Sequence, residues 1–437
     1  MTSKRAPIGV ALMVRDGEKT LGTCLDSLRP YVSQIVVGVD LTTTDKTTKT
    51  AKKHGADIVF PLQVSDWHEC DKHGRVLAQD FAKARNETFK RLDPKLPFWM
   101  WIDADDYLVG GEHLKHLCES LPADALGAWL PYHYATVNNG AATTTLFDRE
   151  RLLRSSVGWE WEYRVHECVK PLSPGTWFPS QALPHPIAVY HQEGVHKSVA
   201  STERNQVLLE IGLEEKGEDP RTTFYLANGH FAAGRLREAV HWYERTTEIS
   251  QNPYECWQSF CYMSLAYRRL GLLDDATRAA FCAVDLIPTY KEAYFRLAEI
   301  YLDAGQYEKV LFWDRIARTM ADPPRFVFTN PLDEQYNSRM AVADALAEMF
   351  RIKEAREVLL TAAAVVPNEH LTARIGRYDE LIAAQDQANA FVQLARGRTD
   401  EQIIALWEHA NLPDDVKAFG RVRDVVMPCY LRQRSAA

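Results

Sequence analysis

An apolar run that stops at a group of carboxylates is the feature that most constrains this chain. Residues 98–102 (FWMWI) have the length and composition of a buried strand, and Asp103, Asp105 and Asp106 follow at once. A buried strand does not explain carboxylates one residue apart at its end. Such carboxylates can converge on one hard cation, and Mg²⁺ or Mn²⁺ held in this way keeps coordination sites open for phosphate oxygens. The pattern favours an enzyme that handles a nucleoside diphosphate; the alternative is an acidic turn that caps the next element.

The segments before this run alternate between strand and helix patterns. The strand-like segments are residues 8–14, 35–39 and 57–60, and the helical segments between them are residues 21–28 and 48–54. This order is typical of parallel βαβ units, whose ligands bind at the carboxyl ends of the strands. Asp40 and Asp103 each follow such a strand directly. We therefore expect both side chains at the same edge of one sheet.

Length, charge and cysteine content narrow the class of protein. A chain of 437 residues predicts about two or three domains. The net charge of -8 argues against a protein that coats nucleic acid, although a local basic groove stays open. No apolar run approaches the length of a membrane span, and the first residues lack a signal-peptide core. None of the eight cysteines belongs to a CxxC pair, so we expect free thiols and a cytoplasmic location.

Four segments together resemble the A-type glycosyltransferases of family 2. They are residues 37–40 (VGVD), 43–47 (TTDKT), 80–86 (DFAKARN) and the Asp103-Ala104-Asp105 triplet after the apolar strand. Each segment alone is common, and their shared order and spacing carry the resemblance. One departure is residues 15–17 (RDG), where many relatives have an Asn-Glu pair. The resemblance implies an α/β, Rossmann-like nucleotide-binding catalytic domain over residues 1–200.

The resemblance also implies roles for individual residues. Asp40 would hydrogen-bond the nucleotide base, and Arg85 would contact the nucleotide or its diphosphate. Asp103 and Asp105, with His191, would hold Mn²⁺ or Mg²⁺ and thereby the nucleotide-sugar donor, in the first place a UDP-sugar. The alternatives are a turn cap for Asp40, a surface arginine paired with a nearby acid for Arg85, and a structural histidine for His191.

The segment 159–167 (WEWEYRVHE) supplies the candidates for a general base. Its closing Val-His-Glu resembles the V-H-E element of family members that carry tetratricopeptide repeats. An inverting transfer needs a base that takes the proton of the acceptor hydroxyl. We rank Glu167 first, Glu162 second and His166 third for this role. The alternative is a strand edge with solvated charges.

From residue 201 onward the pattern is helical. Residues 201–219 predict a linker helix, and Leu-Ala pairs followed by Gly234, Gly271 and Gly305 then recur. These glycines are 37 and 34 residues apart, which matches tetratricopeptide repeats of two helices each. We expect an all-α superhelical repeat domain over residues 220–385, with an insertion near residues 322–337, and capping helices over residues 386–437. The concave face of such repeats often holds a peptide, but the repeats could equally buttress the catalytic domain or form a homodimer.

The sequence as a whole predicts a metal-dependent inverting glycosyltransferase with a nucleotide-sugar donor and a hydroxyl-bearing acceptor. The acceptor stays open between a protein or peptide held by the repeats, a glycan and a modified nucleic acid. One alternative is a weak or inactive transferase domain in a repeat-based protein-binding scaffold. The other is a nucleotidyltransferase on a similar fold, which would usually show a glycine-rich first loop. Residues 13–20 contain one glycine, which counts against that alternative.

Overall fold

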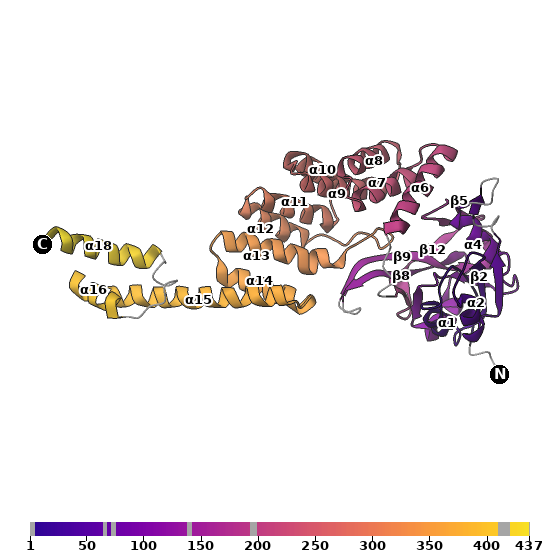
Figure 1. The fold of residues 1–437 in the computed structure, drawn as a ribbon, viewed down its shortest axis with the longest axis horizontal. Helices are drawn as coiled ribbons and strands as arrows, with labels where there is room; N and C mark the ends of the chain where they lie inside the picture. The colour runs from indigo at the N-terminus through magenta and orange to yellow at the C-terminus, as the bar shows by residue number, and fades with distance from the viewer. Residues whose placement is uncertain are drawn as a thin grey trace. The chain divides into compact units, whose positions relative to one another are not determined.

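The chain is divided into two compact units in a computed structural model that describes residues 5–63, 68–70, 76–137, 142–192, 199–409 and 420–436. The first unit comprises Met1–Arg296 and Ala317–Leu332, and the second comprises Leu297–Ile316 and Asp333–Ala437. A mixed β-sheet forms the N-terminal part, and the rest of the chain is helical (Figure 1). The division between the units falls within the helical region. It therefore differs from the predicted boundary between a catalytic and a repeat domain.

The N-terminal sheet has the strand order β3-β2-β1-β6-β9-β8-β13-β7, with β12 beside β8. Its strands are β1 (Ala6–Val14), β2 (Val32–Asp40), β3 (Ile58–Leu62), β6 (Phe98–Trp101), β7 (Asp106–Val109), β8 (Ala125–Val137), β9 (Ala142–Arg154), β12 (Thr176–Phe178) and β13 (Ala188–His191). Strands β3, β2, β1 and β6 are parallel, which confirms the predicted βαβ pattern. Strand β9 is antiparallel to both β6 and β8. The second half of the sheet is therefore mixed.

Helices and small ribbons cover this sheet. The helices are α1 (Leu21–Leu28), α2 (Thr47–Lys53), α4 (Phe81–Phe89) and α5 (Leu114–Ser120), with short 3₁₀ turns η1 (Gly111–His113), η2 (Ser155–Val157) and η3 (Ser180–Ala182). Two antiparallel ribbons pair β10 (Trp159–Glu162) with β11 (Cys168–Pro171) and β4 (His68–Cys70) with β5 (Val76–Gln79). Residues 64–67 and 71–75, on either side of β4, lie outside the described residues.

Both faces of the sheet are buried against other elements. Successive side chains of a strand point in opposite directions, so each strand contributes to both cores. In β1, Val10 and Leu12 pack with α1 and α5 on one face, and Ala11 packs with α4 and β10 on the other. In β2, Val37 lies on the same face as Val10 and Leu12, and Val36 lies on the same face as Ala11. These side chains are almost fully buried, and each valine or leucine contributes about 1.5–3 kcal/mol. This packing fixes the strand ends at which the carboxylates lie.

The helical region begins with α6 (Val199–Lys216), where the linker helix was predicted. The following helices of the first unit are α7 (Pro220–Ala232), α8 (Leu236–Ile249), α9 (Pro253–Arg269) and α10 (Leu273–Leu286), and α11 (Lys291–Asp303) spans the division. Gly234 and Gly271 end the first helix of their pairs with φ of 75°, and Gly305 does so with φ of 67°. Glycine adopts this left-handed conformation without strain, so the recurrent glycines terminate helices as the repeat pattern requires.

The second unit continues the helical pairs. Its helices are α12 (Tyr307–Ala317), the π-helical turn η4 (Asp333–Asn337), α13 (Ser338–Glu348), α14 (Ile352–Val365), α15 (Glu369–Ala395), α16 (Asp400–His409) and α18 (Gly420–Ala436). The predicted boundary at residue 386 lies inside α15, so the repeats and the capping helices are continuous there. Phe350, with φ of 59°, occupies the turn between α13 and α14. Among the described helices, none is long and apolar enough to cross a membrane.

The insertion after α12 returns to the first unit as a strap, defined here as residues 321–329. Gln258 of α9 donates a side-chain hydrogen bond to the carbonyl of Phe328 at 3.1 Å. Thr329 and Leu146 of β9 exchange two backbone hydrogen bonds of 3.0 and 3.1 Å. Phe328 also packs against the apolar clusters of the sheet and of the first helices. The strap thus joins the first helical pairs to the sheet within one unit.

Candidate active site

The carboxylates lie at the edge where the parallel strands end. After β6 the chain makes a tight turn, in which the amide of Asp106 donates to the carbonyl of Asp103 at 3.0 Å. Asp106 then opens β7 and pairs with His191, the last residue of β13. The ligand atoms of Asp105, Asp106 and His191 lie within 4.8 Å of one another. The structure therefore brings together two of the three predicted metal ligands, Asp105 and His191, and adds Asp106.

Asp106 is the buried centre of this cluster. Its Oδ1 accepts from the Tyr132 hydroxyl at 2.8 Å and lies 3.1 Å from Nδ1 of His191. Its Oδ2 accepts from Nη2 of Arg151 at 3.1 Å. Burial raises the pKa of Asp106, and the nearby charge of Asp103 acts in the same direction. Because its oxygens already have these partners, Asp106 is suited to orienting His191.

Asp105 is the more accessible carboxylate. Its side chain is 37% exposed, and its Oδ1 lies 4.0 Å from Nδ1 of His191. Burial raises the pKa of Asp105 to about 6, with further contributions from the charges of Asp103 and Asp106. Burial and the neighbouring carboxylates thus both disfavour the ionised form of Asp105. A cation bound here would favour the ionised form.

Asp103 is engaged by arginines and does not join the cluster. Its Oδ1 accepts from Nη2 of Arg85 at 2.6 Å, and its Oδ2 lies 3.8 Å from Nη1 of Arg151. Burial alone would raise the pKa of Asp103, but the two arginines outweigh it and lower the pKa to about 2. The ligand atoms of Asp103 are not part of the group formed by Asp105, Asp106 and His191. The role of Asp103 as a metal ligand stays a prediction.

The segment 80–86 positions Arg85 through its flanking residues. The carboxylate of Asp80 caps α4 by accepting from the backbone amide of Lys83 at 3.0 Å. The side chain of Asn86 donates to the carbonyl of Trp161 at 3.1 Å and accepts from its amide at 2.9 Å. The motif thus combines a helix cap, a buried charge and a clamp on β10. Arg85 itself is 6% exposed, so it is not the surface arginine of the alternative.

Arg85 links the first carboxylate to the first-ranked base. Its guanidinium lies 4.6 Å from the centre of the Trp101 ring and 4.8 Å from that of Trp161, and these two rings contact each other edge to face. Its Nε donates to Oε1 of Glu167 at 2.6 Å, and its Nη2 donates to Asp103 at the same distance. Burial alone would lower the pKa of Arg85, but the two carboxylates raise it. One guanidinium therefore holds Glu167 beside the carboxylates.

The other two base candidates lie elsewhere. Glu162 forms an ion pair of 3.2 Å with Lys170 on the neighbouring strand β11. The imidazole of His166 stacks on the ring of Tyr225, with ring centres 4.0 Å apart and an angle of 7°. Glu167 is thus the candidate that these contacts place next to Arg85 and Asp103.

The carboxylate of Asp40 accepts hydrogen bonds from the loop that follows β2. Its Oδ1 accepts from the amide and the hydroxyl of Thr42 at 2.8 and 3.0 Å, and the side chain is 2% exposed. These bonds fit the turn-cap alternative, and its contact with a nucleotide base stays a prediction. Asp16, in the departing segment, has φ of 48° and accepts from the amide of Thr44 at 2.7 Å. It joins the loops that follow β1 and β2.

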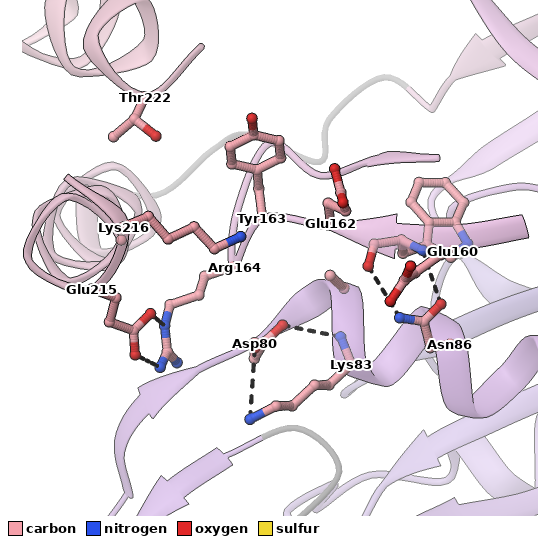
Figure 2. Close-up of a pocket in the computed structure, with 13 residues that line it drawn as sticks. Asp80, Lys83, Asn86, Glu160, Glu162, Tyr163, Arg164, Glu215, Lys216 and Thr222 are labelled. Carbon is pink, nitrogen blue, oxygen red and sulfur yellow. Dashed lines mark hydrogen bonds and ion pairs between the residues drawn. The ribbon is translucent and has the colours of Figure 1, made fainter. Parts of the chain in front are cut away.

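A pocket of about 300 Å³ lies between α4, β10 and α6, and Glu162 is the base candidate that lines it (Figure 2). Four of its charged side chains form two ion pairs. Lys83 lies 3.8 Å from Asp80, and Arg164 forms an ion pair with Glu215 of α6. Asp103, Asp105 and Asp106 are not among its lining residues. The pocket therefore marks the contact of α6 with the segment before Glu167, and not the carboxylate edge.

Two residues that contact this cluster, Tyr132 and Arg151, come from parts of the sequence where no site was predicted. Tyr132 of β8 and Arg151 of β9 reach Asp106 only because those strands are neighbours in the sheet. Arg151 is fully buried, and its Nε has no hydrogen-bond partner in the structure. An arginine next to two leucines in a strand of 13 residues was the available signal for a buried charge. Asp106 belonged to the predicted group of carboxylates, but it was not among the predicted metal ligands.

Comparisons with known proteins return proteins with tetratricopeptide repeats. No protein-family model matches the chain. A segment of 98 residues is 31% identical to the inactive TPR repeat-containing thioredoxin TTL3 of Arabidopsis thaliana, and it covers 22% of this chain and 14% of that protein. This match, with the glycine-terminated helix pairs, supports helical repeats like those of tetratricopeptide proteins. The chain spans only that small part of its relative.

Solved structures of tetratricopeptide proteins give weak similarities. TTC0263, a thermophilic protein of Thermus thermophilus, aligns with a TM-score of 0.32 and 19% identity, over 41% of this chain and 91% of that one. MamA gives 0.31 and 12%, over 41% and 99%. YrrB, described as having an unusual peptide-binding site, gives 0.31 and 15%, over 41% and 85%. TM-scores this low support no conclusion about partners.

Proposed function

We propose that the N-terminal sheet domain is a metal-dependent glycosyltransferase that uses a nucleotide-sugar, in the first place a UDP-sugar. The observation that carries the proposal is the convergence of Asp105, Asp106 and His191 at the edge where the parallel strands end. Ligands of parallel α/β sheets bind at this edge. The resemblance of the segments that contribute Arg85 and the Asp103-Ala104-Asp105 triplet points to the same chemistry.

The residues at this edge fit a hard divalent cation such as Mn²⁺ or Mg²⁺. Asp105 offers an accessible carboxylate, and His191 would use Nε2 because Nδ1 bonds to Asp106. When bound, the cation supplies positive charge for the departing diphosphate. Arg85 and Arg151 neutralise Asp103 and so leave metal binding to Asp105 and His191.

Glu167 is the residue we assign as general base. It would accept the proton of the acceptor hydroxyl as the acceptor oxygen bonds to the anomeric carbon. The bond between that carbon and the diphosphate breaks in the same displacement, and UDP leaves with the bonding electrons. Arg85 supports this assignment because it holds Glu167 within two hydrogen bonds of Asp103.

Metal-dependent nucleotide binding tests the proposal. Calorimetric titration of the full chain with UDP should show binding in the presence of Mn²⁺ and much weaker binding with EDTA. Asp105→Asn should abolish the metal-dependent part, since it removes the accessible carboxylate. Asp124→Asn, at an exposed loop position, is the matched control and should bind like the parent. Equal UDP affinity in parent and Asp105→Asn would refute the metal assignment.

A second function, that of a protein-binding repeat scaffold with a weak or inactive sheet domain, is favoured by a separate observation. The curated relative matches this chain in a segment of 98 residues, and its name describes an inactive thioredoxin that contains TPR repeats. Under this reading the repeats act without the carboxylate edge. The same UDP titration separates the two functions, because a scaffold needs no metal-dependent affinity for a nucleotide.

A further inference from the structure

The turn that leads to Glu167 has an unusual backbone conformation. Tyr163 has φ of 74° and His166 has φ of 52°, both in the left-handed region that favours glycine. Non-glycine residues keep such a conformation only where surrounding structure holds them in it, and such positions cluster at functional sites. Contacts from other elements must therefore fix the turn between β10 and β11. These contacts determine where Glu167 lies.

Helix α7, the first helix after the linker, holds one end of this turn. Arg221 donates from Nε and Nη2 to the carbonyl of His166, at 2.9 and 2.7 Å. Tyr225, one helical turn later, stacks on the imidazole of the same residue. Burial alone would lower the pKa of Arg221, but nearby groups, Tyr225 first, raise it. His166, directly before Glu167, is thus fixed by hydrogen bonds to its backbone carbonyl and by stacking of its imidazole ring.

Helix α6 holds the other end. Glu215 forms an ion pair with the guanidinium of Arg164, and Nζ of Lys216 lies 5.0 Å from the centre of the Tyr163 ring (Figure 2). The carbonyl of Arg164 also accepts from the amide of Phe81 at 2.9 Å, which ties the turn to the start of α4. Residues on both sides of the turn therefore rest on helices that follow the sheet domain in sequence.

We propose that Arg221 is a positioning residue for the general base, so that the first repeat helix completes the active site. The bidentate bond to the His166 carbonyl fixes the peptide that leads into Glu167, and Arg85 receives that carboxylate in a fixed place. A planar guanidinium can make both bonds, whereas an ammonium group can make only one with this direction. This proposal rests on the proposed transferase function.

Three variants of the full chain test this role. Arg221→Ala removes both hydrogen bonds, Arg221→Lys keeps the charge and one bond, and Arg245→Ala is the control. Arg245 lies on α8, pairs with exposed Glu218 and Glu248, and has no contact with the turn among the described residues. Each variant is measured for UDP binding with Mn²⁺, for turnover of a UDP-sugar, and for hydrogen exchange of the peptide that contains residues 163–167.

We expect Arg221→Ala to keep the parental UDP affinity and to lose about 100-fold in turnover, since a misplaced catalytic group costs about this much. Exchange of the 163–167 peptide should rise, while exchange in β1 and β6 stays unchanged. Arg221→Lys should recover part of both effects, and Arg245→Ala should behave like the parent.

Two outcomes would overturn the proposal. Parental exchange of the 163–167 peptide in Arg221→Ala would show that this arginine does not hold the turn. Increased exchange with undiminished turnover would show that holding the turn has no catalytic consequence. Failure of the transferase function itself is recognised separately, because the parent would then neither bind UDP with Mn²⁺ nor turn over any UDP-sugar.

Discussion

Arg85→Met should be one of the most destabilising single substitutions in the sheet domain. Methionine keeps apolar contact with Trp101 and Trp161, but it leaves Asp103 and Glu167 without the guanidinium that joins them. Removal of one partner from a buried ion pair costs about 3–5 kcal/mol, because the remaining charge is left buried and unpaired. At about 2–4 °C per kcal/mol for a domain of about 150–250 residues, that loss corresponds to a fall of about 6–20 °C in melting temperature. The compact unit that contains the sheet is larger, which favours the lower part of this range.

The difference between parent and variant should depend on pH. In the parent, burial raises the pKa of Asp103, but Arg85 and Arg151 outweigh this effect and lower the pKa to about 2. The ionised Asp103 carboxylate therefore stabilises the folded state fully above its unfolded pKa of about 4. This stabilisation is lost as the pH falls toward the folded value. In Arg85→Met, the charge of Arg85 no longer lowers the pKa of Asp103, so burial should raise this pKa in the folded state. The variant should therefore gain stability relative to the parent between neutral pH and about pH 4.

Thermal unfolding of the full chain, followed by tryptophan fluorescence near pH 7 and near pH 5, measures both effects. Lys90→Met, which removes an exposed ion pair with Glu87, is the control and should cost about 0–1 kcal/mol. Combining Arg85→Met with Asp103→Asn and Glu167→Gln should recover much of the loss, since no unpaired charge remains. A melting temperature for Arg85→Met equal to that of Lys90→Met at neutral pH would refute the reasoning.

Three further predictions follow from particular contacts. Mn²⁺ affinity, measured by calorimetry, should fall as the pH drops through about 6, because burial and neighbouring carboxylates raise the pKa of Asp105 to about 6 and protons then compete with the cation; pH-independent affinity would contradict this. Phe350→Gly should stabilise the helical unit against urea by about 0.5–1 kcal/mol, because the ring is 86% exposed and glycine accepts its positive φ; a loss would reveal packing of the ring. Glu167→Gln should lower turnover by about 10²- to 10⁴-fold with UDP binding retained, whereas Glu162→Gln should leave turnover unchanged; the reverse order would move the base to Glu162.

Local patterns predicted the parallel half of the sheet well. Apolar runs bounded by turns marked β1, β2 and β6, and helical spacing marked α1. The rule that parallel strands end at one edge placed Asp40 and Asp103 together on the correct side of the sheet. These inferences succeeded because each depended on residues close in sequence. They did not depend on which distant strands become neighbours.

The contacts that complete the site depend on such neighbours. Arg151 lies 45 residues from Asp106 in the sequence, and Tyr132 lies 26 residues from it. Only the antiparallel insertion of β9 between β6 and β8 brings them together. Arg221 lies 55 residues from His166, on a helix that the repeat pattern assigned to another domain. Hydrophobic periodicity does not encode these pairings.

The turn after β6 explains the remaining difference. The triplet Asp103-Ala104-Asp105 predicted two carboxylates on one ion at the end of the strand. The backbone bond between Asp106 and Asp103 closes a turn, and Arg85 takes Asp103. Turn formation and arginine pairing are decided by tertiary surroundings, which the triplet alone does not contain.

Release of UDP from nucleotide-sugars tests the central claim most directly. The full chain is incubated with Mn²⁺ and each of a panel of UDP-sugars, and free UDP is measured over time for the parent, Asp105→Asn and the control Asp124→Asn. We predict slow hydrolysis of at least one donor by the parent and by the control, with loss of that activity in Asp105→Asn and after treatment with EDTA. Absence of UDP release and of UDP binding in the folded parent, across the whole panel, would contradict the assignment of the carboxylate edge as a donor site.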